Sequence, residues 1–220
     1  MHNPGSETAK RLILLSPLGI IVVGHFTARL ARAVLGPWAW VPMIFVVWAM
    51  FVFLIAWGGG QEAIRRWLRA PQGGWGWSTL AVVVGLIPIG VFIWNWKLFP
   101  SVWIVLLWLL FALINPPLEE GYWRGLLLDT TTSWPGWLAV LYSSFFFAIN
   151  HPLTLGVYSI ANRHPVVLLS TFVMGVVWAV TYRKTRSLRW VIFAHFLTDL
   201  FNLSVLAFMN IYLPHSSRMG

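Results

Sequence analysis

The chain has no cysteine among its 220 residues, and only 10% of its residues are charged. The lack of cysteine excludes disulfides, thiolate metal sites and a cysteine nucleophile. Soluble domains carry about 25% charged residues, so the low charge and the mean hydropathy of +0.75 predict an integral membrane protein. Negatively charged residues are fewer than positively charged ones, with six Asp and Glu against fifteen Lys and Arg.

Long apolar runs fill most of the chain, and 59% of its residues are hydrophobic. A membrane-spanning helix needs about 20 residues, so this length with short loops predicts an all-α, polytopic transmembrane helical bundle of about seven spans. An eighth span, or a re-entrant piece after Pro117, is the alternative and would change the orientation of the chain. We expect a single membrane domain over 1–220, with N-terminal spans in 1–99. The expected spans are 12–26, 38–57, 78–96, 101–114, 136–151, 165–182 and 190–212.

The first apolar run, 12–26, also has features of a signal peptide, because it follows Lys10 and Arg11 and precedes the sequence Ala31-Arg32-Ala33. Arginine fits a cleavage motif poorly, and no ectodomain follows. We therefore expect an uncleaved first span.

The formal net charge of +9 raises the question of a nucleic-acid partner. The basic residues lie between apolar runs, where they orient the spans, so we expect no nucleic-acid partner. Nine Lys and Arg residues lie on one side of the predicted bundle and five on the other. This bias predicts a cytoplasmic N-terminus. We expect the protein in a bacterial inner membrane, with membrane lipid as a partner. The sequence predicts no oligomeric state.

Three ionisable residues, Glu119, Glu120 and Arg124, interrupt the apolar sequence directly after Pro116-Pro117. Each such residue at membrane depth costs at least ~2.5–3.5 kcal/mol, so the cluster needs a structural or chemical reason. Glu120 and Arg124 are four apart and share a helix face, which would also suit a purely structural ion pair. The two prolines predict a break in the helix, opening a cavity beside Glu119.

A second polar group lies on the last expected span, where His195, Asp199 and Asn202 form one stripe at i, i+4 and i+7. His151 ends another span, where a lone histidine is commonly interfacial. At 1.5 Å per residue, Glu119, His195 and His151 lie roughly 15, 9 and 22 Å from the cytoplasmic side. These depths straddle the middle of a ~30 Å core, so a shared site is geometrically allowed.

Two chemistries fit such a site. A carboxylate beside a neutral imidazole in a poorly solvated cavity holds and deprotonates a water molecule, while a second histidine stabilises an oxyanion. Alternatively, Glu119, His151 and His195 bind Zn²⁺ as three protein ligands with water as the fourth. No HExxH sequence is present, so the common zinc-protease signature is absent.

Three motifs follow one another in the second half of the chain. Residues 119–125 read EEGYWRG, residues 147–151 read FAINH, and residues 195–199 read HFLTD. In this order they resemble the EExxxRG, FxxxH and HxxxN/D motifs of the CAAX protease and bacteriocin-processing family, also called CPBP or ABI. The resemblance covers roughly residues 100–205.

The resemblance implies an intramembrane endopeptidase, similar to the type II CAAX prenyl endopeptidases, that acts on a hydrophobic or lipid-modified peptide or protein. By the resemblance, Glu119 and His151 activate the hydrolytic water. His195 and the residue at position 199 stabilise the oxyanion. We favour a mechanism without a metal cofactor, with zinc as the alternative.

The resemblance also implies that Glu120 and Arg124 support the motif helix. One position departs from the pattern, because the prenyl-protein proteases carry Asn where this chain has Asp199. An ionised Asp cannot donate a hydrogen bond to an oxyanion. Asn202, about one turn further along, is a candidate substitute.

Two other classes of protein compete with the protease. One is a non-proteolytic member of the same fold, a membrane scaffold or immunity-type protein, which loss of a catalytic residue would favour. The other is an ion- or proton-coupled transporter, which would use the buried carboxylates as a relay. Transporters commonly show repeated halves, and the sequence has none.

Overall fold

The computed structural model describes residues 7–211, which fold into helices without a strand. The predicted all-α class is therefore confirmed. Only the last residue of the expected span 190–212 lies outside this part of the chain. The α-helices are α1 (Glu7–Leu35), α2 (Trp40–Leu54), α3 (Gly60–Trp67), α4 (Trp75–Gly85), α5 (Ile89–Asn95), α6 (Val102–Glu120), α7 (Leu127–Thr130), α8 (Gly136–Leu153), α9 (Pro165–Thr185), α10 (Arg189–Phe201) and α11 (Ser204–Phe208).

Shorter helical turns join several of these helices. The two π-helical segments are η2 (Ile55–Gly59) and η4 (Gly121–Leu126). The 3-10 segments are η1 (Gly36–Ala39), η3 (Trp96–Leu98), η5 (Leu155–Val157) and η6 (Ala161–Arg163).

Five helical segments within residues 7–211 are long and apolar enough to cross a membrane. The first, Glu7–Trp67, contains both α1 and α2, and the other four are Trp75–Leu98, Val102–Thr130, Gly136–Val157 and Pro165–Thr185. Helix α10 has 13 residues, fewer than the ~20 that a span needs. The chain is an integral membrane protein built as a helical bundle.

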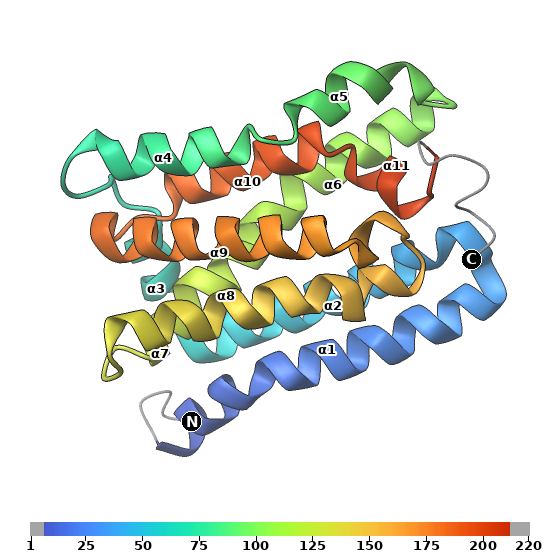
Figure 1. The fold of residues 1–220 in the computed structure, drawn as a ribbon. Coiled ribbons are helices and arrows are strands. Elements are labelled where there is room, and N and C mark those ends of the chain that lie inside the picture. Colours follow the sequence, from blue (N-terminus) through green and yellow to red (C-terminus); the bar gives the residue numbers. More distant parts are fainter. Residues whose placement is uncertain (1–6, 212–220) are drawn as a thin grey trace.

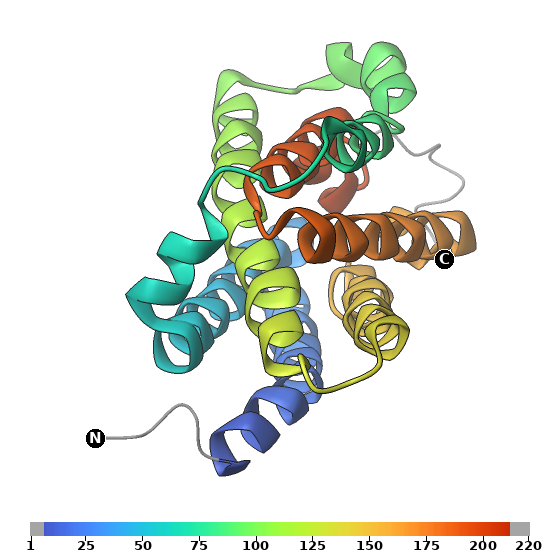
Figure 2. The ribbon, with the colours of Figure 1, turned by 90° about the vertical axis from the view of Figure 1, so that its left-hand side faces the viewer.

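The helices lie side by side with α6 and η4 at the centre (Figure 1, Figure 2). Helix α6 packs against α2, α10 and α11, and η4 packs against α8 and α9. Every residue from Glu119 to Leu128 is buried. The charged motif therefore lies in the interior of the bundle, where its polar groups must find partners within the protein.

The expected helix break at Pro116-Pro117 is wrong. Helix α6 continues through both prolines to Glu120, and the irregularity comes one turn later as the π-helical segment η4. Proline in a transmembrane helix is tolerated where local π adjustments and neighbouring helices satisfy the freed carbonyls, and the backbone N–H of Gly121 bonds to Pro117 O and Leu118 O. Such π segments are frequent at functional sites.

Two glycines allow the close helix contacts that position the motifs. A Cβ on Gly125 would lie 2.8 Å from the Trp67 ring, which packs over η4 and bonds through Nε1 to Asp129. A Cβ on Gly85 would lie 2.4 Å from the backbone oxygen of Ala194. Helices α4 and α10 therefore cross at backbone contact, directly beside His195.

Candidate active site

A cavity of about 300 Å³ lies inside the bundle among α6, α8, α9 and α10. Five residues singled out from the sequence line this cavity, and they come from three separate helices and the residue that follows α10: Glu119, His151, His195, Asp199 and Asn202. The lining is otherwise mostly apolar, with Phe147, Met174 and Trp178 among its walls. Glu120 and Arg124 do not line the cavity and lie behind it, fully buried.

Glu119, which lines this cavity, has one unsatisfied carboxylate oxygen. The residue is 7% exposed, and its Oε2 atom accepts no hydrogen bond from any group in residues 7–211. A buried carboxylate without a donor is costly. Such a group is therefore poised to take a hydrogen bond from a bound water or substrate.

His195 is held in place by the second glutamate of the motif. Its Nδ1 lies 2.7 Å from Oε1 of Glu120, so this nitrogen donates to the carboxylate. The same Oε1 accepts a hydrogen bond from Arg124 Nη1 at 3.0 Å. The imidazole also stacks on Trp178 at 4.9 Å between ring centroids. These contacts fix the ring and leave its other nitrogen, Nε2, for the cavity side.

The Nε2 atom of His195 faces two acids. It lies 3.9 Å from Oε2 of Glu119 and 3.7 Å from Oδ2 of Asp199. Both separations exceed a direct hydrogen bond. Glu119, Asp199 and the free edge of His195 thus bound a polar corner in an apolar cavity.

His151 is held by its own helix. Its Nδ1 lies 2.8 Å from the backbone oxygen of Phe147. A carbonyl oxygen only accepts, so Nδ1 carries the proton and the neutral ring keeps a lone pair on Nε2. An imidazole in this tautomer can accept a proton at Nε2.

Phe147, the first residue of the second motif, links the polar groups. Its ring meets the His151 ring edge-on at 5.0 Å and the His195 ring at 6.0 Å between centroids. The Arg124 guanidinium carbon lies 3.9 Å from the Phe147 centroid, a cation–π contact. The close approach requires Gly175, whose added Cβ would lie 3.3 Å from Arg124 Nη2.

Asn115 is a site residue that the sequence patterns did not reveal. Its Nδ2 donates to Asp199 Oδ2 at 3.1 Å, while its Oδ1 accepts from Trp48 Nε1 at 3.0 Å. The indole donor fixes the orientation of the amide, because Trp Nε1 cannot accept. Asn115 lines the cavity. The one signal in the sequence was a lone polar residue at membrane depth before the two prolines.

Among residues 7–211, no group of three or more His, Asp or Glu side chains is arranged to hold a metal ion. No step proposed below uses a metal.

Comparison with known families gives one finding. Residues 100–201 match the family model described as type II CAAX prenyl endopeptidase Rce1-like. No curated protein and no solved structure matches the chain significantly. The matched segment contains all three motifs and every helix that contributes an acid or histidine to the cavity. This segment, a little under half of the chain, is therefore similar to the Rce1-like branch of the CAAX protease family.

Proposed function

We propose that the chain is an intramembrane endopeptidase that hydrolyses a peptide bond through a water activated by Glu119 and His151. The observation that carries this proposal is the convergence of Glu119, His151 and His195 on one mostly apolar cavity. The match of residues 100–201 to the type II CAAX prenyl endopeptidase family model supports the reaction class.

In the proposed reaction, the unsatisfied Glu119 carboxylate binds a water molecule, and the Nε2 lone pair of His151 accepts a second hydrogen bond from it. Attack of the water oxygen on the carbonyl carbon forms the tetrahedral intermediate, and the water proton moves to the Glu119–His151 pair. The C–N bond then breaks, and that proton passes to the leaving amine. Water is the only co-reactant, so no covalent enzyme intermediate forms.

His195 and Asn115 are the proposed donors to the developing oxyanion. With Nδ1 donating to Glu120, Nε2 of His195 also donates when the ring is in the imidazolium form. The amide of Asn115 keeps a second N–H beyond the one given to Asp199. We propose that Asp199 is a positioning residue that orients Asn115. An ionised Asp199 then need not donate a hydrogen bond to the oxyanion itself, because Asn115 does so.

The proposed substrate is a peptide that reaches the site from the membrane. The cavity is apolar apart from the corner bounded by Glu119, Asp199 and His195, and Ile87 and Val166 in its wall are also 62% and 66% exposed on the bundle surface. These features support a hydrophobic or lipid-modified chain near the cleaved bond. We also propose that the protein lies in a bacterial inner membrane, with a cytoplasmic N-terminus that the bias of basic residues supports.

The proposal is tested with the full chain in liposomes and two peptides of equal sequence, one prenylated at a C-terminal CAAX cysteine and one unmodified. Mass spectrometry should detect hydrolysis at one internal peptide bond, faster for the prenylated peptide. Equal cleavage would contradict a role for the lipid. No cleavage of either peptide, or of a library of hydrophobic membrane peptides, would favour the non-proteolytic scaffold.

A further inference from the structure

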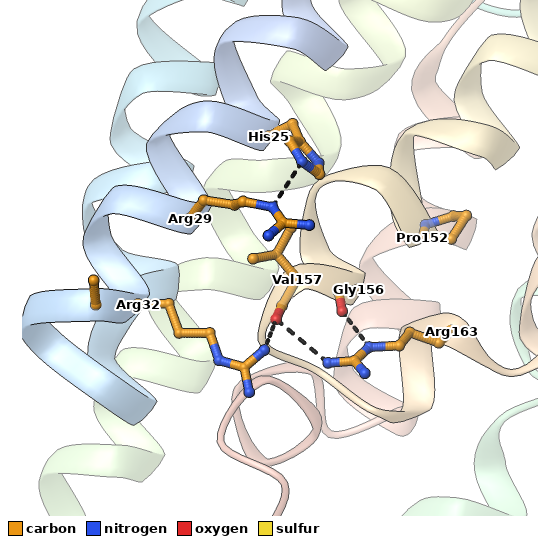
Figure 3. Close-up of a pocket in the computed structure, with 8 residues that line it drawn as sticks. His25, Arg29, Arg32, Pro152, Gly156, Val157 and Arg163 are labelled. Atoms are coloured by element: carbon orange, nitrogen blue, oxygen red, sulfur yellow. Dashed lines mark hydrogen bonds between the residues drawn. The ribbon is translucent and has the colours of Figure 1, made fainter. Parts of the chain in front are cut away.

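A second cavity, of about 650 Å³, lies apart from the catalytic residues and is strongly basic. Arg29 and Arg32 of α1 line it together with Arg163 of η6 (Figure 3). The cavity lies where α1 meets the connection between α8 and α9 (Figure 1). His25 and Pro152 complete two of its sides.

The three arginines lack acidic partners. None of them forms an ion pair with an Asp or Glu among residues 7–211. The chain has six acids, and three of them belong to the catalytic site. The others are Glu7, Glu62 and Asp129, on the first turn of α1 and on α3 and α7, at the opposite end of the bundle (Figure 1). This end of the bundle therefore carries uncompensated positive charge.

Backbone carbonyls bring the guanidinium groups together. Arg32 and Arg163 both donate to the backbone oxygen of Val157, and Arg163 Nε also donates to Gly156 O at 2.5 Å (Figure 3). Two like charges that converge on one oxygen repel each other unless an anion lies between or beside them. The arrangement is prepared for an anion with several oxygen acceptors.

Arg29 is positioned by a histidine. The Nδ1 of His25 donates to Leu153 O at 2.6 Å, so its Nε2 is an acceptor and receives Arg29 Nε–H at 3.0 Å. The spacing of 25, 29 and 32 places all three side chains on one face of α1. The guanidinium of Arg29 is thus held, through His25, at the C-terminal end of α8. Arg32 and Arg163 bond to backbone oxygens a few residues further along the chain.

An exposed apolar strip continues from the basic cavity along α1, toward the middle of that helix. Leu18 and Val22 are 51% and 52% exposed, and their spacing of i, i+4, i+7 and i+11 with His25 and Arg29 places them on the same face of the helix as the cavity. An exposed apolar strip on a membrane helix is covered by lipid chains. A ligand with an anionic head and an apolar tail matches both features, whereas a free anion matches only the first.

We propose that the Arg29–Arg32–Arg163 cavity binds the phosphate group of an anionic membrane lipid, whose acyl chains lie along Leu18 and Val22. Basic pockets between membrane helices recognise such headgroups. The site is independent of the proposed peptidase chemistry, because its test measures binding and not cleavage.

The experiment uses the full chain, purified in an uncharged detergent and titrated with phosphatidylglycerol or with phosphatidylcholine of the same acyl chains. Native mass spectrometry measures the dissociation constant of the first bound lipid. Wild-type protein should bind phosphatidylglycerol more tightly. The triple variant Arg29→Gln, Arg32→Gln, Arg163→Gln should lose that affinity by roughly 100-fold, at about one factor of five for each arginine.

A matched control removes three exposed charges elsewhere, with Arg65→Gln, Arg69→Gln and Lys184→Gln, and should keep the affinity within about three-fold. Equal affinity of the wild-type protein and the cavity variant, or equal binding of the two lipids, would overturn the proposal. If the triple variant does not fold, the single variants Arg29→Gln and Arg163→Gln should each lose about five-fold, and no loss in either would overturn it. Inorganic phosphate is then added as a competitor. If phosphate displaces the lipid with a dissociation constant equal to that of the lipid, the site binds a free anion and the lipid assignment is overturned.

Discussion

Nδ1 of His195 lies 2.7 Å from Oε1 of Glu120, and this one carboxylate oxygen also holds Arg124. The two adjacent glutamates of the motif thus have separate surroundings. Glu120 joins two helices through the buried ion pairs of its Oε1 atom. Glu119 lines the cavity, and its Oε2 atom lies 3.9 Å from Nε2 of His195, beyond hydrogen-bond distance. The Oε2 atom of each glutamate accepts no hydrogen bond within residues 7–211.

The first prediction follows from this division. Glu120→Gln should lower the free energy of unfolding by about 3–5 kcal/mol, because it leaves the buried guanidinium of Arg124 without its counter-charge. Glu119→Gln should leave stability nearly unchanged. Denaturation of both variants in the same detergent measures the difference, and equal losses of stability would show that the two glutamates are not separated in this way.

The second prediction concerns Asn115. Asn115→Ala removes a donor to Asp199 and the proposed donor to the oxyanion, so the turnover rate should fall by about 10²–10³-fold. Asp199→Asn restores an amide at the position where related proteases carry one. In the Asn115→Ala background it should recover part of the rate. A double variant no faster than Asn115→Ala would contradict the assigned roles, with KM measured alongside kcat to separate positioning from binding.

The third prediction concerns the contact of α4 with α10. Gly85→Ala places a methyl group 2.4 Å from the backbone oxygen of Ala194, so the helices must separate beside His195. Overpacking of this kind costs about 1–3 kcal/mol. Activity should fall further than stability alone explains, because His195 moves with α10.

Gly76→Ala on the same helix is the control for this pair. No atom lies within 4 Å of its added Cβ, and alanine is favoured over glycine within a helix by about 0.5–1 kcal/mol. The free energy of unfolding should therefore fall in Gly85→Ala and rise in Gly76→Ala. Turnover, measured on the same two proteins, should fall only in Gly85→Ala. A neutral Gly85→Ala would show that the helix contact tolerates displacement.

The fourth prediction concerns metal. The protein is treated with a strong chelator, and metal analysis then measures the zinc that remains per chain. Protein from which the zinc has been removed should keep its turnover rate. The reason is that the proposed water is activated by Glu119 and His151 alone. Loss of activity on chelation, restored by added Zn²⁺, would contradict the metal-free mechanism.

Much of this arrangement was accessible from the sequence. Apolar runs and their charged boundaries predicted the helical bundle, because lipid allows few other structures. The spacing of four between Glu120 and Arg124 predicted their ion pair. Spacing along one helix does not reveal contacts between helices, and so the bond of Glu120 with His195 and that of Asn115 with Asp199 were not predicted.

The misplaced helix break has a related cause. The two prolines were expected to end α6, but their fixed φ angle suits a helix and the packed neighbours accommodate the missing donors. The distortion lies in η4 instead, where Gly125 lets Trp67 approach the backbone. That contact joins segments far apart in the chain, and no local pattern encodes it.

The most direct test of the central claim compares Glu119→Gln with Glu62→Gln, an exposed glutamate on α3, in liposomes with the same membrane-bound peptide. The account predicts that Glu119→Gln lowers the turnover rate by about 10²–10⁴-fold with unchanged unfolding, while Glu62→Gln cleaves at the wild-type rate. Wild-type turnover by a folded Glu119→Gln protein would contradict the account.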